Sequence, residues 1–277
     1  MCKLKKIFVF LYVHFYYLYN LSRLMRFKVT FRVNKNAYGN ELPISYQYEL
    51  SAWIYSVIAK SDNLYASWLH DNGFSNYNRR FKMFAYSNLS PHCKVIGDRM
   101  VIQNETMHFI LSFLPEKSTE KFVKGIFAEN RFALGDKRSR VQFQVDSIEI
   151  LPIPAQFGKS YEFQTLSPVV ISTKRDDGTI EYLSPEGDGY GKLLINNLKQ
   201  KYSAFYEKPF DGDEYFEFKL TSLIRPRLIT IKADTPKMTK VKGFNYKFKL
   251  SADYRLIQIM YEAGLGEKNA IGFGMVE

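Results

Sequence analysis

The order of predicted helices and strands, which occurs twice along the chain, constrains the fold more than any other feature. From residue 25 to residue 151, the apolar residues switch between the two-residue period of strands and the 3.6-residue period of helices. The switches predict a strand, a helix, a short helix, strands, a helix and a strand. The same order, without the short helix, recurs over residues 161–277. Because this order is typical of the β-α-β-β-α-β unit, the sequence predicts an α+β protein with two tandem ferredoxin-like (RRM-like) domains.

Apolar residues with helical spacing predict the helices of the first domain, residues 25–151. The clearest stripe predicts a helix over residues 48–60. A short helix begins after Ser61 or Asp62 and ends by Gly73, and a third helix covers residues 117–128. The stripe of the first helix contains Leu50, Trp53, Ile54, Val57 and Ile58, and the third helix turns Phe122, Val123, Ile126 and Phe127 inward. Strands are predicted at residues 25–33, 81–87, 94–102, 106–113 and 141–151.

Two prolines and a glycine mark the boundary between the two domains. They lie in the stretch "LPIPAQFGKS", and both residue types disfavour a helix and a central strand. We therefore expect a linker over residues 152–160. After it, the pattern predicts a helix over residues 189–205 and another that ends near Ala263. Strands are predicted at residues 163–173, 215–223 and 241–250, and again after Gly274.

The first 24 residues differ from the rest of the chain. Basic residues precede an apolar run over residues 7–21, which is short for a membrane span and is interrupted by His14 and Asn20. Met25 then stands directly before an alternating strand. We expect translation to begin at Met25, so that residues 1–24 are a mis-called or dispensable extension, with a membrane anchor as the second choice.

The charge of the chain indicates the kind of partner, and its cysteine content indicates the cellular location. The chain has 39 Lys and Arg against 28 Asp and Glu, a formal charge of +11. This balance favours a polyanion or an anionic membrane surface as the partner. Its two cysteines are too few for a disulfide framework, which favours a reducing, cytoplasmic location. No cysteine or histidine pair has metal-ligand spacing, so we expect neither a metal nor another cofactor.

The chain ends on a glycine cluster, "AGLGEKNAIGFGMVE". Glycines of a phosphate-binding loop normally follow a strand and open a helix. Here Gly264 follows a predicted helix instead, which disfavours a dinucleotide or nucleoside-triphosphate fold. A tight turn from helix to strand would use Gly264 as a C-cap, but it leaves Gly266, Gly272 and Gly274 unexplained.

Three stretches carry a family resemblance: "LPISYQYELSAWIYSVIAKSDNLYASWLHDNGF", "FKMFAYSNL" and "GLGEKNAIGFG". With them, and with "TLSPVVI" at the start of the second domain, the chain resembles the CRISPR repeat-RNA processing endoribonucleases of the repeat-associated mysterious protein superfamily. The resemblance runs from residue 25 to the C-terminus. It implies two ferredoxin-like domains that bind one repeat of the CRISPR precursor RNA and cut it once. The implied cleavage needs no metal, because the ribose 2′-OH attacks and leaves a 2′,3′-cyclic phosphate and a 5′-OH.

The resemblance places the active site on Tyr55, His70 and Lys82. The stretch "SNYNRR" before Lys82 is longer than in some relatives, so Arg79 and Arg80 stay as alternatives to the lysine. Transesterification needs a proton removed from the 2′-OH, a stabilised phosphorane and a proton for the 5′-oxygen. We assign His70 to the leaving group, Lys82 to the phosphorane and Tyr55 to the 2′-OH. The roles of His70 and Tyr55 are interchangeable.

The residues alone also allow plainer interpretations of this site. Tyr55 lies about 140° around its helix from Leu50, at roughly 100° per residue, and is predicted to point away from the core. Such a tyrosine is often a half-exposed surface residue, and a lone His70 at a helix end is often a cap. Tyr55 would deprotonate the 2′-OH only if nearby cations lowered its pKa.

The resemblance also implies that the glycine cluster contacts RNA. Its glycines would allow close backbone approach, its lysine would contact a phosphate and its asparagine would supply an amide. These residues are Gly264, Gly266, Lys268, Asn269, Gly272 and Gly274. Arg225 and Arg227 would hold RNA on the second domain. The expected partner is CRISPR precursor RNA, with effector-complex subunits and a homodimer left open and no membrane. The rival hypothesis is an RNA-binding subunit of an effector complex that does not cut.

Overall fold

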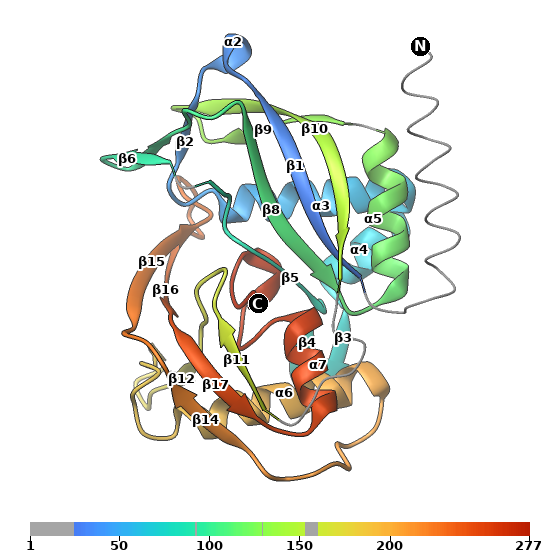
Figure 1. Ribbon diagram of the computed structural model, residues 1–277, viewed down its shortest axis with the longest axis vertical. Helices are drawn as coiled ribbons and strands as arrows, with labels where there is room; N and C mark the ends of the chain where they lie inside the picture. Colours follow the sequence, from blue (N-terminus) through green and yellow to red (C-terminus); the bar gives the residue numbers. More distant parts are fainter. Residues whose placement is uncertain (1–24, 92, 129, 153–159) are drawn as a thin grey trace.

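Two α+β domains, one above the other in Figure 1, make up the part of the chain that the structure describes. The computed structural model describes residues 25–91, 93–128, 130–152 and 160–277. The predicted N-terminal extension, residues 1–24, and most of the predicted linker lie outside these ranges. No helix within them is long and apolar enough to span a bilayer.

An antiparallel five-stranded sheet forms the first domain. From one edge to the other, its strands are β5 (Phe84–Tyr86), β8 (Thr106–Phe113), β1 (Met25–Asn34), β10 (Arg140–Leu151) and β9 (Arg131–Gly135). The first four are the second, third, first and fourth strands of the predicted unit, which is the ferredoxin-like order. β9 is absent from the sequence prediction; it forms a hairpin with β10 and extends the sheet.

Helices α3 (Gln47–Ser61) and α5 (Glu116–Ala128) cover one face of this sheet (Figure 1), and the short α4 (Asn63–Asp71) follows α3. All three are close to their predicted bounds. α3 and α5 approach each other closely because α5 has a glycine at the contact. A Cβ on Gly125 would lie 1.7 Å from the carbonyl oxygen of Val57.

The core of the first domain lies between these helices and the sheet. Phe27 and Phe31 of β1 are fully buried, and Phe122 and Ile126 of α5 are buried as predicted. The inward prediction for Phe127 is wrong, because its side chain is 43% exposed. It is one residue beyond Ile126 and is therefore rotated by about 100° around the helix.

The second domain repeats this arrangement with a shorter sheet. Its strands, in spatial order, are β11 (Ser160–Gln164), β17 (Lys247–Ser251) and β14 (Glu217–Leu220), and its helices are α6 (Tyr190–Tyr206) and α7 (Tyr254–Ala263). The predicted terminal strand is reduced to an isolated bridge between Thr165 and Val276. Next to it, Gln164 and Glu277 exchange backbone hydrogen bonds of 2.8 and 2.9 Å. The last strand thus lies beside the first, as a ferredoxin-like unit requires, and the two-domain prediction is confirmed.

Residues 81–87, predicted as one strand, belong to two. β4 (Arg79–Phe81) forms a hairpin with β3 (Phe74–Asn76), whereas β5 joins the main sheet. The break falls at Met83, whose φ of 54° lies in the left-handed region and does not continue a strand. The stretch "SNYNRR" is therefore part of a hairpin.

Residues 94–102 are a hairpin rather than the single strand predicted. β6 (Lys94–Ile96) and β7 (Arg99–Val101) are joined through Gly97, whose φ is 60°. The chain reverses there because glycine adopts this conformation without strain. The neighbouring short elements are β2 (Glu41–Pro43), which pairs with β7, and α2 (Lys35–Tyr38).

Two hairpins are added to the second domain. Their strands are β12 (Ser172–Lys174) with β13 (Ile180–Tyr182), and β15 (Arg225–Ile231) with β16 (Thr239–Asn245). The predictions of single strands over residues 163–173 and 241–250 are therefore wrong. Each of these segments begins in one sheet and continues in another. The second one changes partner at Tyr246, between β16 and β17.

Side-chain hydrogen bonds to the backbone connect the two domains. Arg26 of β1 is 2% exposed, donates to the carbonyl of Tyr261 at 2.5 Å and lies over the ring of the same residue. Ser51 of α3 donates to the carbonyl of Ala270 at 2.6 Å. Ala270 lies in the 3₁₀ turn η1 (Asn269–Ile271), so this bond fixes the C-terminal loop against α3.

Candidate active site

Tyr55, His70 and Lys82 come together in the first domain. The rings of Tyr55 and His70 meet edge to face, with their centroids 5.2 Å apart. The ammonium of Lys82 donates a hydrogen bond of 2.5 Å to the backbone carbonyl of His70. These residues belong to α3, to α4 and to the segment between β4 and β5. The three predicted site residues are therefore neighbours in space, although they come from separate elements. They are called the catalytic cluster below, after the role that the resemblance predicts for them.

The short helix α4 places His70 in this cluster. Asp62, one of the two predicted caps, caps its N-terminus by accepting from the amide of Tyr65 at 3.0 Å. At the other end, the amide of Gly73 donates to the carbonyl of Trp68 at 2.9 Å. His70 is thus in the last turn of α4.

The β3–β4 hairpin returns the chain to His70. Gly73 permits the close approach, since a Cβ there would lie 2.5 Å from the carbonyl oxygen of Phe81 and 3.1 Å from Cδ of Lys82. Residues 75–80, the longer stretch noted in the sequence, extend outward as the hairpin. They consequently leave Lys82 beside His70 instead of displacing it.

Charged groups surround Lys82 and orient His70. Burial lowers the pKa of Lys82, Arg80 lowers it further and Asp71 opposes both. Arg80 also donates to the carbonyl of Asp71 at 2.9 Å, so this alternative to Lys82 lies beside the cluster as well. The Asp71 carboxylate accepts a hydrogen bond of 2.8 Å from Nδ1 of His70. Nε2 is then the ring nitrogen left for a substrate.

Tyr55 differs from its predicted orientation, and its pKa does not meet the condition for a role as base. Its half-buried ring packs against Phe84, with centroids 5.6 Å apart, rather than pointing away from the core. Burial raises the pKa of Tyr55 above its ordinary value, whereas a role as base requires cations to lower it. Tyr55 is therefore protonated near neutral pH and offers a hydroxyl for hydrogen bonding.

Within the described part of the chain, no group of three or more His, Cys, Asp or Glu side chains is arranged to hold a metal ion. The Asp71 carboxylate is engaged by His70, and the Glu267 carboxylate by Ser172.

The four glycines of the C-terminal cluster have positive φ, but they contact protein. All four are buried. A Cβ on Gly274 would lie 2.0 Å from the carbonyl oxygen of Leu265, and one on Gly266 would lie 2.4 Å from that of Val170. The glycines thus let the loop fold against its own chain, and their contact with RNA stays a prediction. The residues and their φ angles are Gly264 (87°), Gly266 (70°), Gly272 (93°) and Gly274 (76°).

Asn269 is also used inside the protein. Its side chain is buried and donates to the carbonyls of Leu265 and Phe273, both at 3.1 Å. Its Oδ1 accepts from Lys201 at 2.7 Å. The amide predicted to reach RNA is thus hydrogen-bonded within the protein, and its contact with RNA stays a prediction. Lys268 is exposed, and its contact with a phosphate stays a prediction.

A lysine that the sequence analysis does not identify holds this loop. Lys201 of α6 is 1% exposed, and its ammonium donates to the carbonyls of Gly264 and Gly266 at 2.5 and 2.9 Å as well as to Asn269. Burial lowers the pKa of Lys201 to about 7, and Glu267 opposes the shift. The loop is thus tied to α6 on one side and to α3 on the other.

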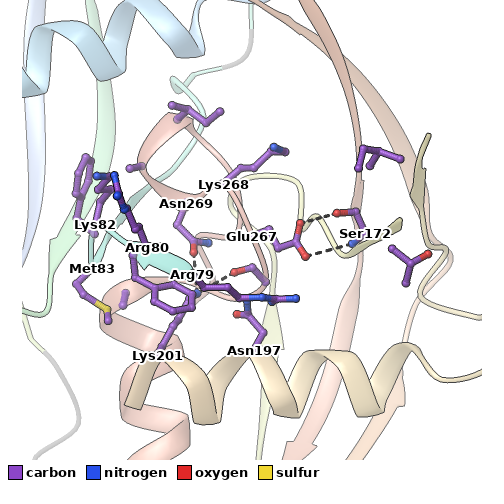
Figure 2. A pocket seen from close by; sticks show the side chains of 18 of the residues that line it. Arg79, Arg80, Lys82, Met83, Ser172, Asn197, Lys201, Glu267, Lys268 and Asn269 are labelled. Carbon is purple, nitrogen blue, oxygen red and sulfur yellow. Dashed lines mark hydrogen bonds between the residues drawn. The ribbon is translucent and has the colours of Figure 1, made fainter. Parts of the chain in front are cut away.

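A cleft of about 530 Å³ lies between the two domains, beside the catalytic cluster. Figure 2 shows α6 along its floor, with Asn197 and Lys201 on that helix. Among the described residues that line it, the one carboxylate is that of Glu267, which accepts from the Ser172 hydroxyl at 2.7 Å. Because both domains supply cations, a nucleic-acid backbone would meet positive charge on either side. The basic residues of the rim are Arg79, Arg80, Lys82, Lys174 and Lys268.

Comparison with known proteins finds similar proteins for both domains. Residues 152–277 match the family described as "CRISPR associated protein Cas6, C-terminal", and residues 41–149 match "CRISPR-associated protein Cas6, N-terminal". CRISPR-associated endoribonuclease Cas6 1 of Methanocaldococcus jannaschii is 34% identical over 239 residues, which cover 85% of this chain and 86% of the relative. This chain belongs to the Cas6 family.

Other Cas6 proteins extend the likeness. CRISPR-associated endoribonuclease Cas6 of Pyrococcus furiosus is 27% identical over 259 residues, or 91% of this chain and 89% of the relative. A solved structure titled "CRISPR associated protein Cas6" is 30% identical and superposes with a TM-score of 0.70. It covers 92% of this chain, and the match spans 99% of that structure. The likeness therefore includes both ferredoxin-like domains.

In this Cas6 chain, Arg225 and Arg227 are not part of the cleft. Both are exposed on β15, and neither lines the cleft. Their hairpin is attached to the first domain, since the amide of Thr230 donates to the Ser45 hydroxyl at 3.1 Å. The same hairpin carries three exposed lysines, Lys237, Lys240 and Lys242. RNA contact at Arg225 and Arg227 stays a prediction for a second basic surface.

Replacing Lys201 with methionine is expected to destabilise this Cas6 protein. The change leaves buried carbonyls without a donor, at a cost of about 1–3 kcal/mol. The stability lost on this substitution should increase with pH. Because the folded-state pKa of Lys201 is about 7 and lies below the unfolded value, the unfolded chain binds more protons above pH 7, and the lysine contributes more stability as pH rises.

Urea denaturation at pH 6 and pH 9 measures this effect, with Lys192→Met, an exposed lysine of the same helix, as the control. The deficit of Lys201→Met relative to wild type should be about 2 kcal/mol larger at pH 9 than at pH 6. An equal deficit at both pH values would contradict the prediction.

Proposed function

We propose that this Cas6 protein is a metal-independent endoribonuclease that cuts the repeats of a CRISPR precursor transcript to give mature guide RNAs. The observation that carries the proposal is the meeting of Tyr55, His70 and Lys82 beside a basic cleft. The names of the relatives, CRISPR-associated endoribonucleases, support the same activity. Repeat RNA would supply the polyanion that the net charge of +11 favours.

The chemistry that suits this cluster is attack by the ribose 2′-OH on the neighbouring phosphodiester. The Tyr55 hydroxyl, kept neutral by burial, orients the 2′-OH, whose proton leaves to solvent. The Lys82 ammonium stabilises the charge that develops on the phosphorane. His70 protonates the departing 5′-oxygen through Nε2. One P–O bond forms and one breaks, which leaves a 2′,3′-cyclic phosphate and a 5′-OH.

We also propose where the protein acts and with which proteins it associates. The protein acts in the cytoplasm, where the precursor RNA is made. Transfer of the product to effector-complex subunits and self-association as a homodimer are each tested by purification with and without repeat RNA. An RNA-dependent increase in the mass of the purified particle that exceeds the mass of the bound RNA would support either association.

Incubation of the full chain with repeat RNA in excess EDTA is the test of the proposed activity. We expect one cut in each repeat. The 5′ ends should accept a labelled phosphate from polynucleotide kinase without prior dephosphorylation, and acid should open the cyclic phosphate at the 3′ ends. Cutting that requires Mg²⁺ or leaves a 5′-phosphate would contradict the mechanism. Tight binding without any cut would favour an RNA-binding subunit instead.

A further inference from the structure

Asn197, at the floor of the interdomain cleft, is a buried polar residue whose oxygen has no partner. Only 2% of the residue is exposed, and its Oδ1 makes no hydrogen bond within the described residues. It precedes Lys201 by about one turn of α6 (Figure 2), but the ammonium of Lys201 already donates to three other acceptors. An unpaired buried amide oxygen is costly. The Oδ1 atom of Asn197 therefore needs a hydrogen-bond donor that the described residues do not supply.

The cleft around Asn197 has the size and lining of a nucleotide site. Its volume, about 530 Å³, falls within the range of roughly 300–1,000 Å³ that is usual for small ligands. Phe81, Ile180 and Ile271 add partly exposed apolar surface to the lining, and the rim is cationic. Unpaired bases are bound by apolar surfaces of this kind, and their phosphates by lysine and arginine.

We infer that the cleft binds one unpaired nucleotide next to the scissile phosphodiester, with its base at Asn197 and its phosphate at the rim. Lys82 supports this position because it belongs both to the catalytic cluster and to the wall of the cleft. A nucleotide in the cleft would therefore be continuous with a phosphodiester at His70. The link to the scissile bond rests on the proposed function, whereas the nucleotide site itself does not.

Adenine is the base that best complements Asn197. A carboxamide presents one acceptor beside one donor, and asparagine pairs with the N6 amino group and N7 of adenine through two hydrogen bonds. The N6 amino group would give Oδ1 of Asn197 the donor it lacks. At the edge that corresponds to N6 and N7 of adenine, uracil offers only the O4 acceptor, because its N3–H donor lies on the Watson–Crick edge.

Binding of single-stranded hexa-adenylate, hexacytidylate and hexauridylate to the full chain tests the inference. With 5′-labelled oligonucleotides and fluorescence anisotropy at a fixed salt concentration, wild type should prefer adenylate over uridylate by at least about fivefold. Asn197→Leu, which keeps the volume and removes both polar atoms, should abolish that preference. Because the variant also removes an unpaired oxygen, its melting temperature should not fall.

Two matched variants separate base recognition from charge. Asn196→Leu changes the exposed neighbouring asparagine of the same helix and should retain the preference. Lys268→Ala should weaken binding of all three oligonucleotides equally and reduce the salt dependence. If Asn197→Leu proves unstable, Asn197→Ser serves instead.

The inference is overturned if wild type shows no preference for adenylate, or if the preference persists without Asn197. Binding is measured without cleavage, so the proposed function is tested separately. If the protein discriminates between bases through Asn197 but never cuts repeat RNA, the inference of a nucleotide site stands and the proposed endoribonuclease activity is rejected.

Discussion

His70→Ala is expected to lower the single-turnover rate of repeat cleavage by about 10²–10⁴-fold, which is the usual contribution of a proton-transfer group. RNA affinity should be nearly unchanged, because the variant removes a proton donor and leaves the cationic rim of the cleft intact. Stability should be nearly unchanged as well, since the His70 side chain is 65% exposed and its hydrogen bond is to the adjacent Asp71. A gel assay with excess protein separates the chemical step from binding.

His108→Ala is the matched control for this measurement. His108 lies on β8 outside the cleft lining and is half-buried, so its loss removes a histidine without touching the catalytic cluster. Its cleavage rate should equal that of wild type. Undiminished cutting by His70→Ala would remove His70 from the mechanism, and equal losses in both variants would point to a general effect on folding.

Helix spacing and strand alternation were sufficient to predict the two ferredoxin-like units. α3, α5, α6 and α7 each bury one apolar stripe, so their periodicity is strong. The bounds of α3, α5 and α6 and the end of α7 were predicted within about two residues. The strands were harder, because alternation continues through a change of partner. β16 and β17 are separated by Tyr246 alone, and that residue is buried like its neighbours Phe244 and Phe248.

The hairpins could not be predicted from apolar pattern because they bury little. Arg225, Arg227 and Leu228 of β15 are all exposed, and alternation appears only near Ile229 and Ile231. A strand that pairs mainly with one neighbour at the surface has no buried face to show in its sequence.

The predicted active-site residues followed from resemblance rather than from their spacing. The sequence intervals between Tyr55, His70 and Lys82 do not show that a hairpin brings Lys82 back to His70. The behaviour of Tyr55 also depends on tertiary contacts, because Phe84, which covers its ring, comes from a distant strand.

A sequence signal did exist for the two missed residues of α6. Leu194 and Leu198 define the buried stripe of this helix, and Asn197 and Lys201 fall on the same face at helical spacing. Polar residues on an apolar stripe need partners inside the protein or in a ligand. Here Lys201 finds three acceptors, whereas Oδ1 of Asn197 finds no donor in the described structure.

The second large effect is expected from the substrate rather than from the protein. A repeat RNA with 2′-deoxyribose at the nucleotide on the 5′ side of the scissile phosphate lacks the attacking hydroxyl. Because the phosphates and bases are retained, the RNA should bind the cationic cleft as the unmodified repeat does. It should nevertheless remain uncut, because the cluster of Tyr55, His70 and Lys82 has no other nucleophile to direct at the phosphorus.

The most direct measurement is therefore a cleavage time course with this deoxy substrate and the matched all-ribose repeat, both in EDTA and at saturating protein. If the neighbouring 2′-OH is the nucleophile, the all-ribose repeat is cut to completion while the deoxy repeat stays intact and competes for binding with equal affinity. Cutting of the deoxy repeat at the same phosphodiester would contradict this mechanism, since a nucleophile other than the neighbouring hydroxyl would then have broken the bond.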